Sequence, residues 1–220
     1  YVQWNKKIKK WSYASGVRFE YMNRDFQLQD KANLIDSTYS YTYFKPFFSG
    51  NVSYTSTENL TWKLNFTQRV ERETTFKMNP FPEREHSETL EQGDPTVLPE
   101  FINTAEIGVI KTWDANSLFV TAYYNRIKNL VNRVNTVYND SILNRIYSNV
   151  GTGQSYGLEV GTAIFLSEKW KTYLGGTVYR YTIDGTFDQK LVNQATWVNS
   201  VNLNSTYTIS PSFSSQFSFS

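Results

Sequence analysis

The connections between the candidate β-strands of this chain alternate between short and long. Short turns are expected at Asn5–Lys10, Ser56–Asn59, Trp113–Asn116, Ser167–Lys171 and Ser210–Ser212. Long connections are expected between them, at Asp25–Tyr39, Val70–Asn103, Asn129–Ser148 and Asp184–Ala195. The short turns are bordered by Trp4, Trp11, Trp62, Trp113 and Trp170, whereas Trp197 adjoins a long connection. Such asymmetry with aromatic edges is typical of a sheet that crosses a membrane.

The strand segments show apolar and polar residues in strict alternation. In Leu60–Thr67, for example, Trp62 and Leu64 share one face and Lys63 and Asn65 the other. A soluble β-sandwich alternates in the same way. Three features favour a transmembrane barrel: strands of about ten residues, a polar face rich in Asn, Ser, Thr and Gly, and tryptophans at strand ends.

We therefore predict an all-β fold, an antiparallel up-and-down transmembrane β-barrel of which residues 1–220 form one part. The alternation gives about nine strands and a stub at Tyr1–Trp4. The mixed stretch Leu130–Leu143 is compatible either with a short helix or with two strands extended into a hairpin. Both chain ends lie within predicted strands, so we expect a fragment of a larger barrel.

Composition argues against several other classes of protein. No run of about 18 apolar residues predicts a transmembrane helix, and no signal peptide is visible. The net charge of +2 is too small to indicate nucleic-acid binding. With one histidine, no cysteine and no G-x-S-x-G motif, a hydrolytic triad has no support. We expect no enzymatic activity, no cofactor and no metal site.

Several short motifs occur in a fixed order along the chain. Phe66–Arg72 is similar to a "Y-x-x-R-x-x-R-P" strand end, with Glu73 in place of the proline. Met78-Asn79-Pro80-Phe81 is similar to "L-N-P-F", and residues 93–100, GDPTVLPE, to "G-N-P-x-L-x-P-E". Further matches are "G-x-R-x-E" at residues 16–20, "E-x-G" at 106–108 and "N-x-G…G-x-E" at 149–159.

Together these motifs resemble TonB-dependent outer-membrane receptors, and most closely the outer-membrane β-barrel family related to SusC-like transporters. The resemblance implies a 22-stranded barrel in the outer membrane of a Gram-negative cell, surrounded by outer-membrane lipid. It also implies an N-terminal plug domain, a TonB energy-coupling complex and uptake of a scarce ligand such as a siderophore, glycan or peptide. We expect this sequence to contain neither the plug nor the final strands. Glu73, Asp94 and Val97 depart from these motifs, and we expect the departures to change the conformation of the loops more than the fold.

The predicted polar face carries candidates for contact with a ligand or with the plug. A charge on the lipid face costs about 2–4 kcal/mol at the bilayer midplane, so charged strand residues are expected to point into the lumen. Of the two roles we favour plug contact. Gly157, Gly161, Gly175 and Gly176 are expected to bend strands or to let the plug approach. The lumen candidates are Arg18, Glu20, Lys63, Glu106, Tyr123, Asn125 and Glu159.

The longest connection concentrates charged residues that either close over a ligand or simply form a solvated surface, which we favour. His86 has acidic neighbours, but a single histidine is weak evidence for a metal site, and we interpret it as an ordinary loop residue. The outer-loop candidates are Arg69, Arg72, Asn79, Glu83, His86, Asp94 and Glu100.

Two functions remain open from the sequence. The leading hypothesis is an active transporter or receptor of the outer membrane. The alternative is a non-transporting β protein, either an adhesin-like outer-membrane barrel or a soluble carbohydrate-binding sandwich whose Tyr and Trp side chains stack on sugars.

Overall fold

A computed structural model describes residues 1–29, 36–86, 88–138 and 142–220, which fold mainly as long β-strands. Ten strands form one wall: β1 (Val2–Ile8), β2 (Trp11–Gln29), β3 (Asp36–Thr57), β4 (Leu60–Glu71), β7 (Glu100–Trp113), β8 (Asn116–Tyr138), β9 (Ile142–Ser167), β10 (Trp170–Phe187), β11 (Lys190–Ser210) and β12 (Phe213–Phe219). The segment between β4 and β7 holds a helical turn α1 (Thr75–Met78) and strands β5 (Glu83–His86) and β6 (Thr89–Gln92).

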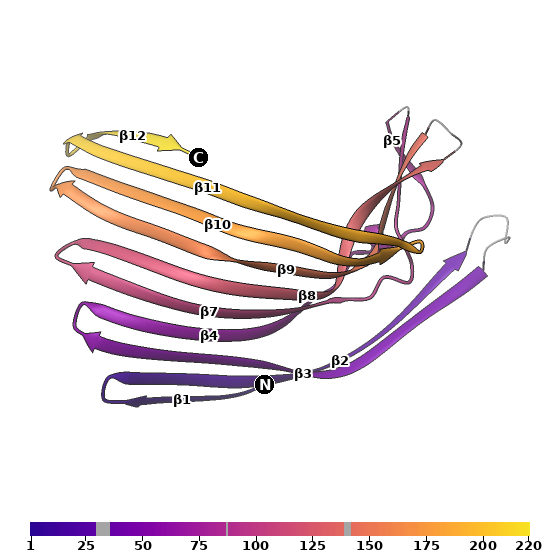
Figure 1. The fold of residues 1–220 in the computed structure, drawn as a ribbon, viewed down its shortest axis with the longest axis horizontal. Coiled ribbons are helices and arrows are strands. Elements are labelled where there is room, and N and C mark those ends of the chain that lie inside the picture. Colours follow the sequence, from indigo (N-terminus) through magenta and orange to yellow (C-terminus); the bar gives the residue numbers. More distant parts are fainter. Residues whose placement is uncertain (30–35, 87, 139–141) are drawn as a thin grey trace.

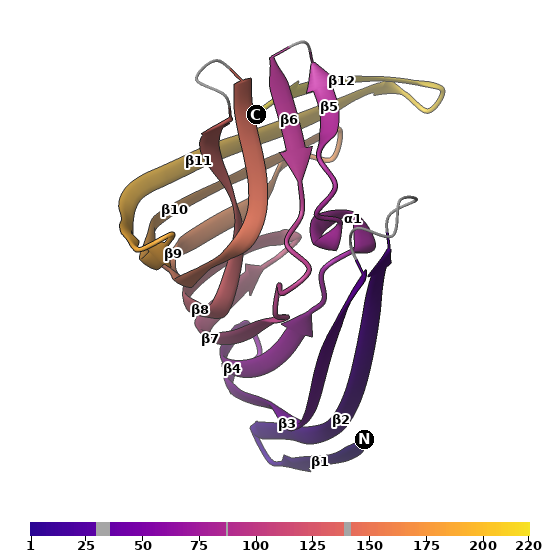
Figure 2. The same ribbon diagram turned by 90° about the vertical axis from the view of Figure 1, so that its right-hand side faces the viewer.

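The wall strands lie side by side in chain order, each antiparallel to the next (Figure 1). The sheet is a curved strip that does not close on itself (Figure 2). The prediction of an antiparallel up-and-down sheet with nine to ten strands is therefore confirmed. No helix among the described residues is long and apolar enough to cross a membrane.

The strand register separates the wall into an apolar and a polar face. One row runs across neighbouring strands through Trp11, Tyr54, Trp62, Val109, Val120, Val160, Gly176 and Val201. The next row contains Ser53, Lys63, Gly108, Thr121, Glu159, Thr177 and Ser200. Successive residues of a strand point to opposite faces, so the first row belongs to the apolar face and the second to the polar face.

The apolar face lies open in the described chain. Leu64, Ile107 and Val201 are about half exposed, and no second sheet covers the wall that the structure describes. The alternative of a soluble sandwich, in which this face is buried, is therefore wrong. An apolar surface of this extent requires another apolar phase to cover it.

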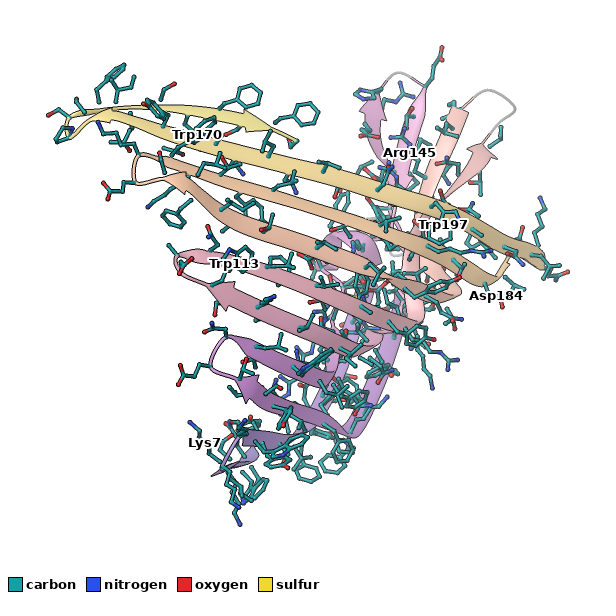
Figure 3. All side chains as sticks on the ribbon, turned by 60° about the vertical axis from the view of Figure 1, so that its left-hand side comes forward. Lys7, Trp113, Arg145, Trp170, Asp184 and Trp197 are labelled. Carbon is teal, nitrogen blue, oxygen red and sulfur yellow. The ribbon has the colours of Figure 1, made fainter. Side chains whose placement is uncertain are left out.

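The five predicted short turns all lie at the same end of the wall (Figure 1). Figure 3 shows Trp113 and Trp170 near this end, while Trp197 and Asp184 lie toward the other. Trp11 and Trp170 begin their strands and Trp113 ends its strand, as interfacial anchors do. The first turn was predicted too early, because β1 continues to Ile8 and leaves Trp4 within the strand.

Three of the predicted long connections are in large part strand. β2 continues to Gln29, β8 to Tyr138 and β10 to Phe187, so each loop is a hairpin that extends beyond the predicted strand ends. The Leu130–Leu143 stretch is thus strand within the described residues, not helix. The prediction of a long loop at Asp184–Ala195 is wrong. Asp188 and Gln189, at φ 47° and 62°, form a two-residue turn of the kind that favours tight hairpins, without the glycine that normally marks it.

The longest connection, residues 72–99, folds over the concave side of the wall (Figure 2). Its strand β6 pairs in parallel with β9 from Thr89↔Leu143 to Gln92↔Ile146. Nearby, Leu130, Val150 and Ile183 form a small buried cluster at the same end of the wall. The sequence predicted one loop here and missed β5, β6 and α1.

Candidate functional site

The face that segment 72–99 covers is the polar one, which we call the inner face. Segment 72–99 contacts Glu20 and Arg24, which alternate in register with the outward Phe19 and Tyr21. All seven lumen candidates, Arg18, Glu20, Lys63, Glu106, Tyr123, Asn125 and Glu159, share this inner face by register. Whether they contact a ligand or a plug stays a prediction.

Glu20 is the centre of one polar cluster on this face. Its carboxylate accepts hydrogen bonds from the Arg72 guanidinium and the Tyr43 hydroxyl, and Arg18 lies 3.4 Å away. The Glu20 side chain is 16% exposed and that of Arg72 is 49% exposed. A lumen candidate and an outer-loop candidate thus form one ion pair, which ties the start of segment 72–99 to β2.

A second cluster crosses three strands at mid-wall. Asn51 donates to Asn65, and Asn65 Nδ2 donates to Glu106 Oε2 at 3.2 Å. Asn125 Nδ2 lies 3.4 Å from Ser155 Oγ, and the Tyr123 ring lies 6.4 Å from the Tyr179 ring. These groups form a hydrogen-bonding surface that suits a wet lumen.

The inner-face glycines make room for these rings. A Cβ at Gly157 would lie 2.3 Å from Val178 O, and one at Gly161 would lie 2.4 Å from the Phe119 ring. A Cβ at Gly175 would lie 2.6 Å from the Tyr173 hydroxyl, whereas Gly176 lies in the outer row of Val160 and Val201, where a Cβ would lie 3.2 Å from Ser200 O. Neighbouring strands and side chains therefore occupy the space above Gly157, Gly161 and Gly175 that was predicted to admit a plug.

The motif at residues 93–100 joins segment 72–99 to the hairpin of β8 and β9. Asn149 Oδ1 accepts from Leu98 N at 2.7 Å, and Asn149 Nδ2 donates to Leu98 O at 3.1 Å and Asn129 O at 2.6 Å. Ser148 Oγ donates to Asp94 Oδ2 at 2.7 Å, and Asn129 Nδ2 donates to Pro99 O at 3.1 Å. Val97 is fully buried beneath these bonds.

Two ionisable groups beside the motif have shifted pKa values. About 9–11 residues of a tilted strand cross a bilayer, so counting from Trp113 places Glu100 beyond the span. Burial raises the pKa of the Glu100 carboxyl, which accepts from Val131 N at 2.6 Å. Burial lowers the pKa of Lys77, but the ion pair with Glu73 at 2.6 Å and the charges of Glu100 and Glu71 outweigh it and raise that pKa overall. Glu100 and Lys77 thus both help to hold segment 72–99 in place, through the bond to Val131 N and the ion pair with Glu73.

The other outer-loop candidates do not converge on one point. Asp94 Oδ1 accepts hydrogen bonds from the backbone N and the hydroxyl of Thr96, and Asn79 Oδ1 accepts one from Phe81 N at 3.1 Å. Both side chains therefore fix the local backbone. Glu83 and His86 lie exposed on β5, and Arg69 is exposed on β4. Within the described ranges no three His, Cys, Asp or Glu side chains form a possible metal site. Asn79, Asp94, Arg72 and Glu100 thus make contacts within the chain. Whether any of the outer-loop candidates contacts a ligand stays a prediction.

Sequence reasoning missed several residues that hold this region together. Arg24 donates to Val97 O at 2.7 Å and Met78 Sδ at 3.0 Å, and Tyr43 and Ser148 complete the contacts described above. Arg24 and Tyr43 lie in or beside a predicted loop, so the sequence did not assign their side chains to the inner face of a strand. Asn149 was quoted only as part of a motif, without a partner.

We expect the Glu20–Arg72 pair to stabilise segment 72–99 modestly. Arg72→Ala should raise the rate at which a protease cleaves residues 72–99, by a factor corresponding to about 1 kcal/mol, because Arg72 is half exposed and its ion pair is screened. Glu20→Gln should have a similar effect, and the double variant should add little to either. Fully additive effects in this double-mutant cycle would contradict the pairing.

A curved antiparallel wall with an apolar outer face, a polar inner face and tryptophans at one rim defines a transmembrane β-barrel of the outer-membrane class. The model of the outer membrane protein beta-barrel family matches residues 1–220. The chain belongs to this family and forms part of a multi-pass barrel of the cell outer membrane.

Solved structures give the same fold. The ferric enterobactin receptor PfeA of Pseudomonas aeruginosa matches with a TM-score of 0.54 at 14% identity, over 96% of this chain and 37% of that one. The siderophore receptor PirA of Pseudomonas aeruginosa gives 0.55 at 15%, over 97% and 51%. The copper transporter OprC gives 0.60 at 11%, over 93% and 38%. This chain thus spans less than two thirds of each, and no curated protein matches it.

Proposed function

We propose that this chain forms part of the barrel wall of an outer-membrane active transporter of the TonB-dependent type. The observation that carries the proposal is the polar inner face covered at one mouth by segment 72–99, an arrangement suited to controlled entry into a wet lumen. The neighbours are named as receptors for ferric enterobactin and siderophores and as a copper transporter, which supports the class. The ligand here is a scarce nutrient of the siderophore, glycan or peptide kind.

We further propose that the inner-face charges at mid-wall bond to an N-terminal plug domain of the complete protein. Glu106 is bonded only to Asn65 among the described residues, and Lys63 and Glu159 have no carboxylate or cation within 4 Å in that part of the chain. Charges of this kind are stabilised by partners that fill the lumen. The plug in turn would contact the energy-coupling complex.

Uptake by cells tests the transporter proposal. A strain that lacks the complete protein, with and without a plasmid copy, is given labelled ferric siderophores, glycans and peptides. We expect one ligand to accumulate only with the plasmid copy, and a protonophore should abolish its accumulation. Accumulation that resists the protonophore would indicate a passive pore. Binding to the cell surface without any accumulation would favour the adhesin-like alternative.

A further inference from the structure

The apolar outer face ends in a row of aromatic residues on the side of the long connections. The register joins Phe66, Ala105, Tyr124, Tyr156, Arg180 and Trp197 across six strands. Tyr124, Tyr156 and Trp197 are 40%, 44% and 65% exposed, and the rings of Tyr156 and Trp197 lie 6.5 Å apart. Trp197 lies toward this end in Figure 3. Aromatic rows of this kind lie at the level of lipid headgroups.

Beyond the aromatic row the outer face becomes polar and basic. The next outward row contains Gln68, Asn103, Arg126, Gln154 and Thr182, and the row after it contains Phe101, Lys128, Thr152 and Asp184. Together with Arg180, these rows place three cations, Arg126, Lys128 and Arg180, on one patch of the outer face. We call these three residues the basic rim.

The basic rim lacks internal charge partners. No carboxylate of the described residues lies within 4 Å of Arg126, Lys128 or Arg180. Asp184 is the one acidic residue in these two rows, two positions along β10 from Thr182. At the edge of this patch β3 no longer pairs with β4 beyond Ser49↔Thr67, and Lys45 Nζ, from an inner-face position of β3, lies 3.7 Å from the centre of the Phe101 ring. The three cations of the basic rim and the carboxylate of Asp184 therefore give this patch a net charge of +2.

Short turns of outer-membrane barrels face the periplasm, so the rim lies in the outer leaflet. Its side chains point away from the lumen, because they share a face with Phe66 and Tyr124 and not with Glu106 and Asn125. A transported ligand or a plug therefore cannot meet them from inside. The three side chains of the basic rim therefore face the headgroup layer of the lipid.

We propose that the basic rim binds the phosphorylated glycolipid of the outer leaflet. Guanidinium and ammonium groups pair with phosphate. Gln68 binds Asn103 Oδ1 and the Tyr124 hydroxyl binds Gln154 Oε1, which leaves the amide groups Asn103 Nδ2 and Gln154 Nε2 to donate to sugar hydroxyls. The aromatic row contacts the first segments of the acyl chains. This site is independent of the transported ligand, and it holds for a barrel of any function in this membrane.

We test the proposal by measuring which lipid the complete outer-membrane protein retains. The purified protein in detergent is titrated with an acylated, bisphosphorylated glucosamine disaccharide, and bound lipid is counted by native mass spectrometry. The variant Arg126→Gln/Lys128→Gln/Arg180→Gln should bind about a hundredfold more weakly, since each cation near a charged headgroup contributes about fivefold. The charge-preserving Arg126→Lys/Lys128→Arg/Arg180→Lys should bind within a few-fold of the wild type.

A matched control removes three cations at the opposite rim. Lys9 and Lys169 lie in short turns, and Lys111 lies near the end of β7 beside Trp113. Lys9→Gln/Lys111→Gln/Lys169→Gln should leave glycolipid binding unchanged. Equal loss in both triple variants, or equal binding of the dephosphorylated glycolipid by the wild type, would overturn the proposal. Competition by inorganic phosphate at millimolar concentration equal to that by the glycolipid would also overturn it, because the site would then recognise a free anion.

Discussion

Replacing Leu64 or Val120 with arginine should prevent most of the complete protein from assembling in the membrane. Both residues lie on the outer face, each as the fifth residue of its strand, and Leu64 is 54% exposed in the chain. An arginine that faces lipid near the bilayer midplane costs about 2–4 kcal/mol. That cost is a large fraction of the stability of a typical folded protein. Heat-modified mobility of the protein in outer-membrane fractions measures the folded fraction.

The neighbouring residue provides the matched control for this experiment. Asn65 lies on the inner face beside Glu106, so Asn65→Arg places the same cation next to a carboxylate in a polar lumen. We expect it to assemble in amounts close to the wild type. Equal assembly of Leu64→Arg, Val120→Arg and Asn65→Arg would show that the assignment of the two faces is wrong.

Asn149→Ala should release segment 72–99 from the wall. The variant removes three hydrogen bonds, to Leu98 N, Leu98 O and Asn129 O. At about 1 kcal/mol for each bond, and with buried backbone groups left unpaired, the loop attachment should weaken by about 3 kcal/mol. Hydrogen exchange of the amides in residues 94–99 should then accelerate by about a hundredfold, because exchange follows local opening.

Asn135→Ala serves as the control for this loop release. Asn135 lies exposed on β8, in the same hairpin as Asn149. We expect its exchange rates in residues 94–99 to match the wild type. If Asn149→Ala and Asn135→Ala left these rates equally slow, residues 93–100 would be held by packing around Val97 and Pro99 instead of by the Asn149 amide.

The sequence predicts the wall of this protein well because a wall strand has only two environments. Alternation assigns Leu64 and Lys63 to opposite faces, and the register of six further strands agrees with that assignment. Tryptophans at strand ends located the turn side for the same reason, since an amphipathic ring has a preferred depth. Both signals depend on single residues and need no knowledge of distant contacts.

The mouth could not be predicted in the same way. Beyond the bilayer both faces meet water or protein, so the alternation in β2, β3, β8 and β9 weakens although the strands continue. The two-residue turn at Asp188 and Gln189 carries no glycine. Contacts such as Asn149 to Leu98 join positions 51 residues apart, and nothing near either residue in the sequence indicates the other. The lumen candidates were found because they lie on wall strands, and Arg24 and Tyr43 were missed because they lie where the wall leaves the membrane.

The parallel pairing of β6 with β9 has a consequence for biogenesis. Each wall strand pairs with its neighbour in the chain, so the wall can grow by the addition of one hairpin after another. Segment 72–99 is different, because its strand β6 pairs with β9, which follows β7 and β8 in the sequence. The segment can therefore complete this pairing only when β9 is in place. A wall without β9 would lack this attachment, so the cover of the mouth depends on a strand that lies about fifty residues further along the chain.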